Sequence, residues 1–128
     1  MSLITFEFST VVSEECGGIK PGYKRISRKS INKHIGEDIM VTSRIEYNKK
    51  HVICTEMYCS KEDPCCNSCG LEYAKFKKAK LYGNNIGCGG NNCNWKKNCA
   101  YSRKDRVTVY GKVTDKNVIQ VHEHCEKK

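Results

Sequence analysis

Alternating apolar and polar positions recur along the chain and predict a mainly β protein. An apolar residue at every second position places one face of a strand in a core and the other face in solvent. The segments with this alternation are residues 4–12, 38–47, 51–59, 73–83 and 106–125. We therefore expect a core of about five strands, with a hairpin in residues 106–125 that turns at residues 114–117.

One of these segments changes phase in its middle. In YAKFKKAKLYG, Ala74 and Phe76 alternate in one parity, whereas Ala79 and Leu81 alternate in the other. One inserted residue near Lys77 restores a single apolar face, and such an insertion is typical of a β-bulge.

Other segments predict which side chains face the core. Met40 alternates onto the solvent face of residues 38–47. A short helix is expected around RKSINKHIGEDI, where Ile31 and Ile35 are four residues apart and Gly36 ends the helix. The positions expected to face inward are Ile39, Val41, Ile45, Tyr47, Val107, Val109, Ile119, Val121 and Cys125.

The chain is short and poor in ordinary core residues. It has 128 residues, and its hydrophobic fraction of 38% already includes ten cysteines. A single domain of this composition needs cross-links or a metal in addition to apolar burial. We expect an N-terminal extension with a basic segment in residues 1–37, then a small five-stranded OB-like barrel with a cysteine-rich excursion in residues 38–125. A disulfide-linked β-sandwich is the alternative.

The ten cysteines favour a disulfide scaffold over a zinc site or a redox motif. No histidine lies in the dense stretch between Cys54 and Cys99, so zinc there needs cysteine ligands alone and leaves surplus thiols. Cys65 and Cys66 are adjacent and are expected to bridge to different partners, while the connectivity stays open. The cysteines expected in disulfides are Cys16, Cys54, Cys59, Cys65, Cys66, Cys69, Cys88, Cys93, Cys99 and Cys125.

Such cysteine use predicts an exported protein. We expect a secreted, periplasmic or cell-surface location, with the export signal removed, because MSLITFEFSTVV lacks a basic segment followed by an apolar one. The sequence contains no run of about twenty apolar residues, so it predicts no transmembrane helix.

The formal net charge of +9 predicts attraction to polyanions or to acidic proteins. Aromatic residues lie among the basic clusters and offer stacking surfaces for bases or sugar rings. The candidate binding residues are Lys24, Arg25, Arg28, Lys29, Lys75, Lys77, Lys78, Lys80, Trp95, Lys96, Lys97, Tyr101, Arg103, Lys104 and Arg106.

No motif predicts catalysis or a cofactor. The phosphate-binding loop, the nucleophile elbow and the zinc-protease helix motif are all missing from the sequence. His122 and His124 share one face of a predicted strand, but no third metal ligand is indicated. We therefore expect a protein that is not an enzyme and holds no metal.

Part of the sequence resembles a group of bacterial domains. CTEMYCSKEDPCCNSC, GCGGNNC, VTVYGKV and a last strand ending at Cys125 are similar to small Cys-rich secreted or lipoprotein-type domains with an OB-like barrel, which are largely uncharacterised. The resemblance covers residues 38–125 and implies export and a barrel.

The function that these features favour is an exported, non-enzymatic binding module. Its basic, aromatic-containing surface would bind a polyanion, such as a glycan, a nucleic acid or an anionic surface, or an acidic protein partner. Two alternatives stay open: a structural or interaction domain of the cell envelope, and an all-cysteine zinc module that binds nucleic acid.

Overall fold

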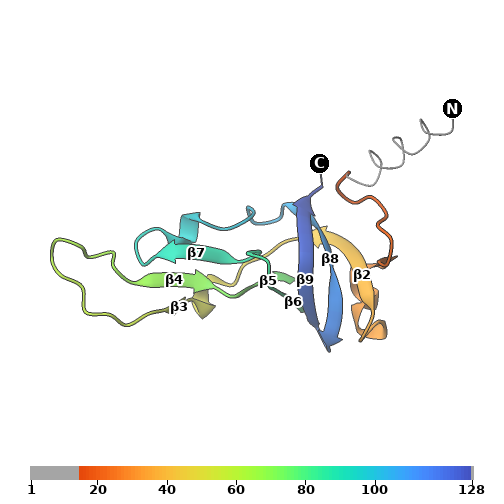
Figure 1. Cartoon of the computed structure of the whole chain (residues 1–128), viewed down its shortest axis with the longest axis horizontal. Helices are drawn as coiled ribbons and strands as arrows, with labels where there is room; N and C mark the ends of the chain where they lie inside the picture. Colours follow the sequence, from red (N-terminus) through yellow and green to blue (C-terminus); the bar gives the residue numbers. More distant parts are fainter. Residues whose placement is uncertain (1–14, 128) are drawn as a thin grey trace.

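The computed structural model describes residues 15–127 as nine strands and three short 3₁₀ helices in an elongated molecule (Figure 1). The predicted strand at residues 4–12 lies outside the described residues. The elements are β1 (Lys24–Arg25), η1 (Arg28–Lys33), β2 (Asp38–Arg44), η2 (Lys49–His51), β3 (Ile53–Cys54), β4 (Ser68–Leu71), β5 (Tyr73–Phe76), β6 (Ala79–Tyr82), β7 (Cys88–Asn91), η3 (Trp95–Lys97), β8 (Arg106–Asp115) and β9 (Val118–Glu126).

The larger sheet has six strands in the order β1-β2-β8-β9-β6-β5. The outer pair β1–β2 and the inner pair β6–β9 are parallel, and the other neighbours are antiparallel. Glu46, two residues after β2, makes a single antiparallel bridge to Lys75 in β5. The protein is thus mainly β, as predicted, and its regular strand pairing does not close into a barrel.

One face of this sheet holds the main core. The residues Ile39, Val41, Val107, Val109, Ile119 and Val121 are buried as predicted, and they pack against Phe76 and Leu81 of the β5–β6 hairpin. Cys125 is only half buried and is bonded to Cys16, so its predicted inward position is wrong. A register shift at His122 pairs Cys125 with Thr108 on the opposite face. Met40 is also buried, with 1% of its surface exposed, so its predicted solvent position is wrong. Met40 and its neighbour Tyr110 lie on the face of the sheet opposite the main core. The chain before β1 covers this second face, and there the Tyr110 hydroxyl donates to the carbonyl of Gly18 at 2.7 Å.

The phase change in residues 73–83 is a hairpin and not a bulge. Phe76 pairs with Ala79, so Lys77 and Lys78 form a two-residue turn between β5 and β6. Lys77 has a φ of 56°, a left-handed conformation that such turns require. A turn of two residues keeps Ala79 on the buried face opposite Phe76, which explains the shift in parity.

A bulge does occur in β9, at a position that the sequence pattern missed. Tyr110 pairs with Glu123 and Gly111 pairs with Val121, so His122 has no opposite residue in β8. The side chain of Asn84 donates to the freed carbonyl of His122 at 2.7 Å, which satisfies the main chain of the bulge.

The predicted helix is shorter than its apolar spacing suggested. Only the 3₁₀ helix η1 forms, with Ile31 buried and Ile35 half exposed. Gly36 then takes a φ of +90°, and its amide donates to the carbonyl of Val113, which fixes the chain against β8 before β2 begins.

The second sheet, β3-β4-β7, extends away from the first and is called the arm, residues 52–99 without the β5–β6 hairpin. Its own small core contains Cys69, Leu71, Cys88 and Trp95. The long loop between β3 and β4 forms the far end of the arm (Figure 1). The predicted strand at residues 51–59 is therefore reduced to β3, and most of that segment is loop.

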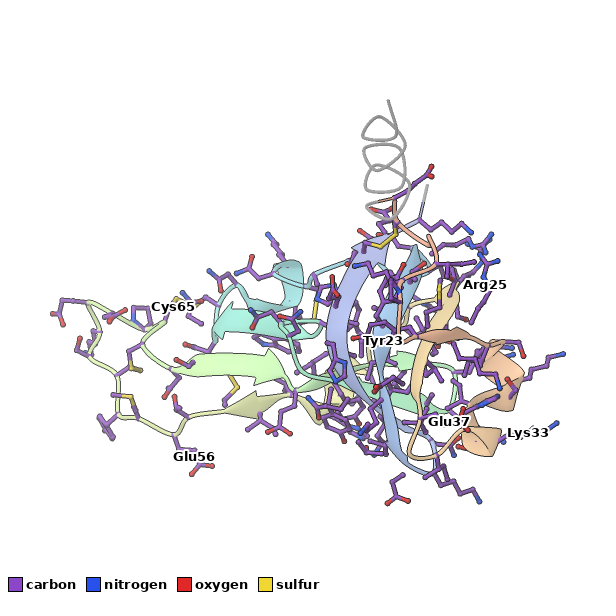
Figure 2. The ribbon with its side chains drawn as sticks, turned by 45° about the vertical axis from the view of Figure 1, so that its right-hand side comes forward. Tyr23, Arg25, Lys33, Glu37, Glu56 and Cys65 are labelled. Atoms are coloured by element: carbon purple, nitrogen blue, oxygen red, sulfur yellow. A yellow bond between two sulfur atoms is a disulfide. The ribbon has the colours of Figure 1, made fainter. Side chains whose placement is uncertain are left out.

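All ten cysteines are joined in five disulfides. Cys16–Cys125 ties the chain before β1 to the end of β9, while Cys54–Cys69, Cys59–Cys66, Cys65–Cys93 and Cys88–Cys99 cross-link the arm (Figure 2). Cys65 and Cys66 do bridge to different partners, as predicted. Five disulfides indicate an oxidising, extracytoplasmic environment, and they leave no thiolate for the zinc alternative.

Candidate binding groove

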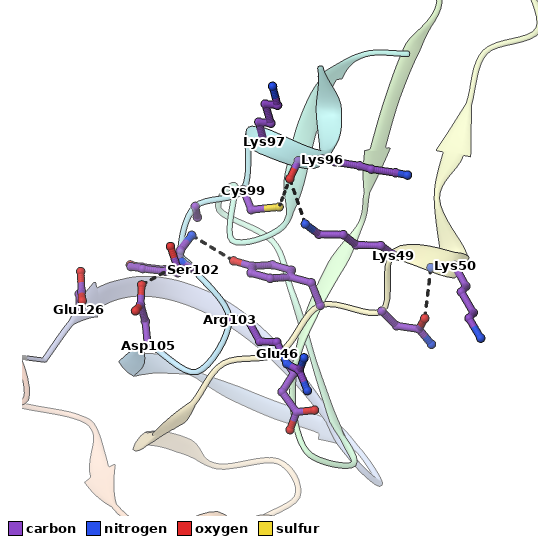
Figure 3. A pocket seen from close by; sticks show the side chains of 14 residues that line it. Glu46, Lys49, Lys50, Lys96, Lys97, Cys99, Ser102, Arg103, Asp105 and Glu126 are labelled. Atoms are coloured by element: carbon purple, nitrogen blue, oxygen red, sulfur yellow. Dashed lines mark hydrogen bonds between the residues drawn. The ribbon is translucent and has the colours of Figure 1, made fainter. Parts of the chain in front are cut away.

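A groove of about 1110 Å³ lies where the arm joins the larger sheet. Its walls come from the connection between β2 and β3, from η3 and from the loop that leads into β8 (Figure 3). These segments are about fifty residues apart in sequence, and they meet because both connect one sheet to the other.

Tyr47 forms the floor of the groove and joins the two cores. Its ring packs against both hydrophobic clusters. Its hydroxyl donates to the carbonyl of Ile86 at 2.9 Å and accepts from the amide of Tyr101 at 3.2 Å. Burial raises the pKa of Tyr47 to about 12, so the neutral phenol is the form that the fold holds.

Tyr101 lies beside Tyr47 and is held by a histidine. The Tyr101 hydroxyl and Nδ1 of His124 are 2.5 Å apart. Nε2 of His124 is 2.7 Å from the carbonyl of Asn84, so an Nε2–H group donates to that carbonyl. Burial also raises the pKa of Tyr101. Both tyrosine hydroxyls are therefore engaged within the fold.

Four lysines line the groove above this floor. Lys49 donates from Nζ to the carbonyl of Lys96 at 3.0 Å, which links its two walls. Lys50 and Lys97 extend the positive charge on either side (Figure 3). The Nζ of Lys96 lies 5.8 Å from the centre of the Trp95 ring.

A second hollow continues the groove along β2 and β8. The two share Glu46 and Arg103 in their linings. Arg44 donates to the carbonyl of Lys104 at 3.0 Å, and the amide of Lys104 donates to the carbonyl of Ile45 at 2.8 Å, so the loop is fixed against β2. We call the combined surface the basic groove; its cations are Arg44, Lys49, Lys50, Lys77, Lys96, Lys97, Arg103, Lys104 and Arg106.

The positive charge of the basic groove is largely uncompensated. Three carboxylates line it, Glu46, Asp105 and Glu126, and Asp105 accepts from the amide of Ser102 at 2.9 Å to close the loop. Within residues 15–127 the contacts between a basic and an acidic side chain are the Lys20–Glu123 ion pair and the His34–Glu37 hydrogen bond, which lie elsewhere. In the part of the chain that the structure describes, no groove cation therefore forms an ion pair with a carboxylate of the protein.

The structure brings together only some of the predicted binding residues. Lys77, Lys96, Lys97, Tyr101, Arg103, Lys104 and Arg106 line the basic groove. The predicted residues that do not line it are Lys24 and Arg25 in β1, Arg28 and Lys29 in η1, and Lys75, Lys78 and Lys80 on the β5–β6 hairpin. Trp95 is 6% exposed and belongs to the core of the arm, so its predicted place on the surface is wrong.

Four groove residues were missed by the sequence. Lys49 and Lys50 follow Asn48 in a stretch that was interpreted only as a turn, and Tyr47 and Arg44 were assigned to a strand. A basic pair directly after a strand was the available signal, since such positions lie at a sheet edge where loops converge.

The two histidines of β9 have hydrogen-bond partners within the fold. Nδ1 of His122 lies 3.0 Å from the Tyr23 hydroxyl, and His124 is engaged on both ring nitrogens. Among residues 15–127 no cluster of three or more histidine, cysteine or acidic side chains has the arrangement for a metal ion.

Comparison with known proteins adds no relative: no family model, curated protein or solved structure matches the chain. In the described part of the chain, no helix has the length and apolar character needed to span a membrane.

Proposed function

We propose that the protein is an exported, non-enzymatic binding module whose basic groove binds a polyanion. The observation that carries this proposal is the set of nine cations on one continuous surface, none of which forms an ion pair with another residue among 15–127. Cations in such a cluster repel one another, and a polyanion relieves that repulsion while it releases its own counterions.

The groove favours a densely sulfated glycan over a single-stranded nucleic acid. Binding of unpaired bases relies on exposed aromatic rings on which they stack. Here Trp95 is buried, Tyr47 and Tyr101 are half buried, and both tyrosine hydroxyls already have partners. The groove thus offers charge along a path with little stacking surface, which suits sulfate groups spaced along a chain.

We also propose that the larger sheet is an incomplete OB-type barrel of the secreted or lipoprotein-type bacterial domains that the sequence resembles. The strands β2, β5, β6, β8 and β9 are the five that would form it. The Glu46–Lys75 bridge supports closure, since it joins the chain after β2 to β5 at the opposite end of the sheet order. The parallel pairing of β6 with β9 supports the same arrangement.

Immobilised heparin, with salt elution, tests the proposed function. The variant Lys96→Glu/Lys97→Glu reverses two groove charges, and Lys24→Glu/Lys29→Glu makes the same change in net charge outside the groove. We expect the groove variant to elute at clearly lower salt than the control variant, because only the groove cations contact the glycan together.

Two results would contradict the groove. Equal losses in both variants would mean that net charge alone drives retention, as the cell-envelope alternative requires. If the wild type fails to bind heparin even at low ionic strength, the proposal that the protein binds a polyanion is refuted. Stronger salt resistance on single-stranded DNA than on heparin would overturn the preference for a sulfated glycan.

A further inference from the structure

The far end of the arm holds a four-residue segment, residues 55–58, between two disulfide-bonded cysteines. Cys54 is bonded to Cys69 and Cys59 is bonded to Cys66, so the chain between Cys54 and Cys59 is anchored covalently at both ends. The third bond joins Cys65 in the returning chain to Cys93, which lies two residues after β7. An exposed loop with such anchors keeps its shape without a core of its own.

One side chain fixes the backbone of this segment from inside. Asn67 accepts from the amide of Met57 at 2.6 Å and donates to the carbonyl of Met57 at 3.2 Å. It also accepts from the hydroxyl of Thr55 at 3.0 Å and donates to the sulfur of Cys59 at 3.4 Å. Asn67 is itself held by Asn92, whose side chain accepts from the amide of Asn67 at 3.2 Å.

The neighbouring residues present their backbone to the outside. Because polar groups of an extended chain alternate in direction, binding of both main-chain groups of Met57 to Asn67 turns those of Glu56 and Tyr58 away from the arm. Neither residue has a hydrogen bond within the described part of the chain. Glu56 projects outward from the arm in Figure 2.

Tyr58 is the most exposed large side chain on this loop. Its relative exposure is 104%, and that of Met57 is 62%. A fully exposed tyrosine gains nothing from burial within the protein, whereas its ring carries a large apolar area that a partner pocket can take up. The loop therefore presents a main chain without turns or bends at residues 55–60, anchored by disulfides on both sides, with one fully exposed aromatic side chain.

We propose that this loop is a substrate-like inhibitor segment for a serine endopeptidase whose S1 pocket accepts an aromatic side chain. An extended peptide binds a protease cleft by adding a strand to its edge, which requires free main-chain groups such as those of Glu56 and Tyr58. The hydrophobic S1 slot then receives Tyr58. Because the disulfides and Asn67 already hold the bound conformation, little ordering entropy is lost on binding. This role is separate from that of the basic groove.

The Cys59–Cys66 disulfide explains why such a loop inhibits the protease instead of being cleaved and released as a substrate. The protease serine adds to the carbonyl carbon of Tyr58, the C–N bond to Cys59 breaks, and the serine proton passes through the protease histidine to the freed amine. That amine stays bonded to the arm through Cys66, so it remains beside the ester. Its attack re-forms the peptide bond and restores the serine hydroxyl, because a tethered amine has a high effective concentration.

The test is inhibition of chymotrypsin by the intact protein, with trypsin as the comparison. We expect wild type to inhibit chymotrypsin at least about 100-fold better than trypsin, and Tyr58→Ala to raise the chymotrypsin inhibition constant by about 100-fold. Tyr58→Lys should reverse the preference, because the trypsin pocket carries a carboxylate. Ile19→Ala, a substitution of another exposed apolar residue, should change neither constant.

Asn67→Ala tests the internal support while it leaves every disulfide in place. We expect weaker inhibition by at least about 10-fold and faster cleavage of the Tyr58–Cys59 bond, followed as a gain of one water in intact mass. Rapid cleavage of the wild-type loop, no inhibition of chymotrypsin, or a Tyr58→Lys variant that does not inhibit trypsin would each overturn the proposal. Lys96→Glu/Lys97→Glu should inhibit as wild type does, so failure of the groove and failure of the loop are distinguishable.

Discussion

Removal of the Cys16–Cys125 disulfide is expected to cost about 4–5 kcal/mol of stability. This bond closes a loop with a sequence separation of 109 residues, and loop closure in the unfolded chain costs more for longer loops. The other disulfides lie inside this loop and shorten it. Because the cost depends on the logarithm of loop length, they lower the value by less than about 0.5 kcal/mol.

The assay is equilibrium unfolding in guanidinium chloride for Cys16→Ala/Cys125→Ala. Its matched control is Cys59→Ala/Cys66→Ala, which opens a loop with a sequence separation of only 7 residues in the arm. The same relation gives about 2 kcal/mol for that loop, so the first variant should lose clearly more free energy of unfolding. Equal losses in the two variants, or a loss under about 1 kcal/mol for the long loop, would refute the loop-entropy reasoning.

Two further changes test the packing of the larger sheet and of the groove floor. Gly111→Ala should lower the free energy of unfolding by about 1–3 kcal/mol, because a Cβ there would lie 2.2 Å from the carbonyl oxygen of Gln120 in β9. Gly89→Ala is the control, since a Cβ at Gly89 meets nothing within 4 Å and should be tolerated. Thermal unfolding of the two variants measures the difference. Since burial raises the pKa of Tyr47 from 10.0 to about 12, its contribution to stability is complete below pH 10 and declines as the pH rises towards 12. The stability difference between wild type and Tyr47→Phe, measured by urea unfolding at several pH values, should therefore shrink above pH 10, and a constant difference would contradict this.

Side-chain periodicity was sufficient to predict the inner faces of the long strands. Val107, Val109, Ile119 and Val121 are buried as expected, because one covered face leaves a direct mark on the sequence. Met40 was placed wrongly because the chain before β1 covers the second face, and contacts between distant segments leave no periodic signal.

The alternation of apolar residues was ambiguous where a bulge and a turn change it in the same way. A bulge and a two-residue turn both displace the alternation by one position, so Lys77 was assigned to the wrong one. The cysteines were more informative. Ten of them, with no histidine between Cys54 and Cys99, predicted the disulfides, although their connectivity needed the structure.

The basic groove was only half predictable. Clusters were defined by neighbours in sequence, whereas the groove is formed by two distant segments, so Lys49 and Lys50 were missed. Trp95 was included because lysines follow it, yet its ring fills the small core of the arm. The role of Asn67 in the arm leaves no sequence signal at all, since any asparagine in a turn-rich stretch has the same appearance.

The central claim is that the cations of the basic groove contact a polyanion together. The most direct measurement is the slope of log Kd against log salt concentration for heparin, by fluorescence titration. We expect Lys96→Ala/Lys97→Ala to reduce the slope by about two, one for each lost contact, and Lys24→Ala/Lys29→Ala to leave it unchanged. A slope that falls equally in both variants, or in neither, would contradict the account.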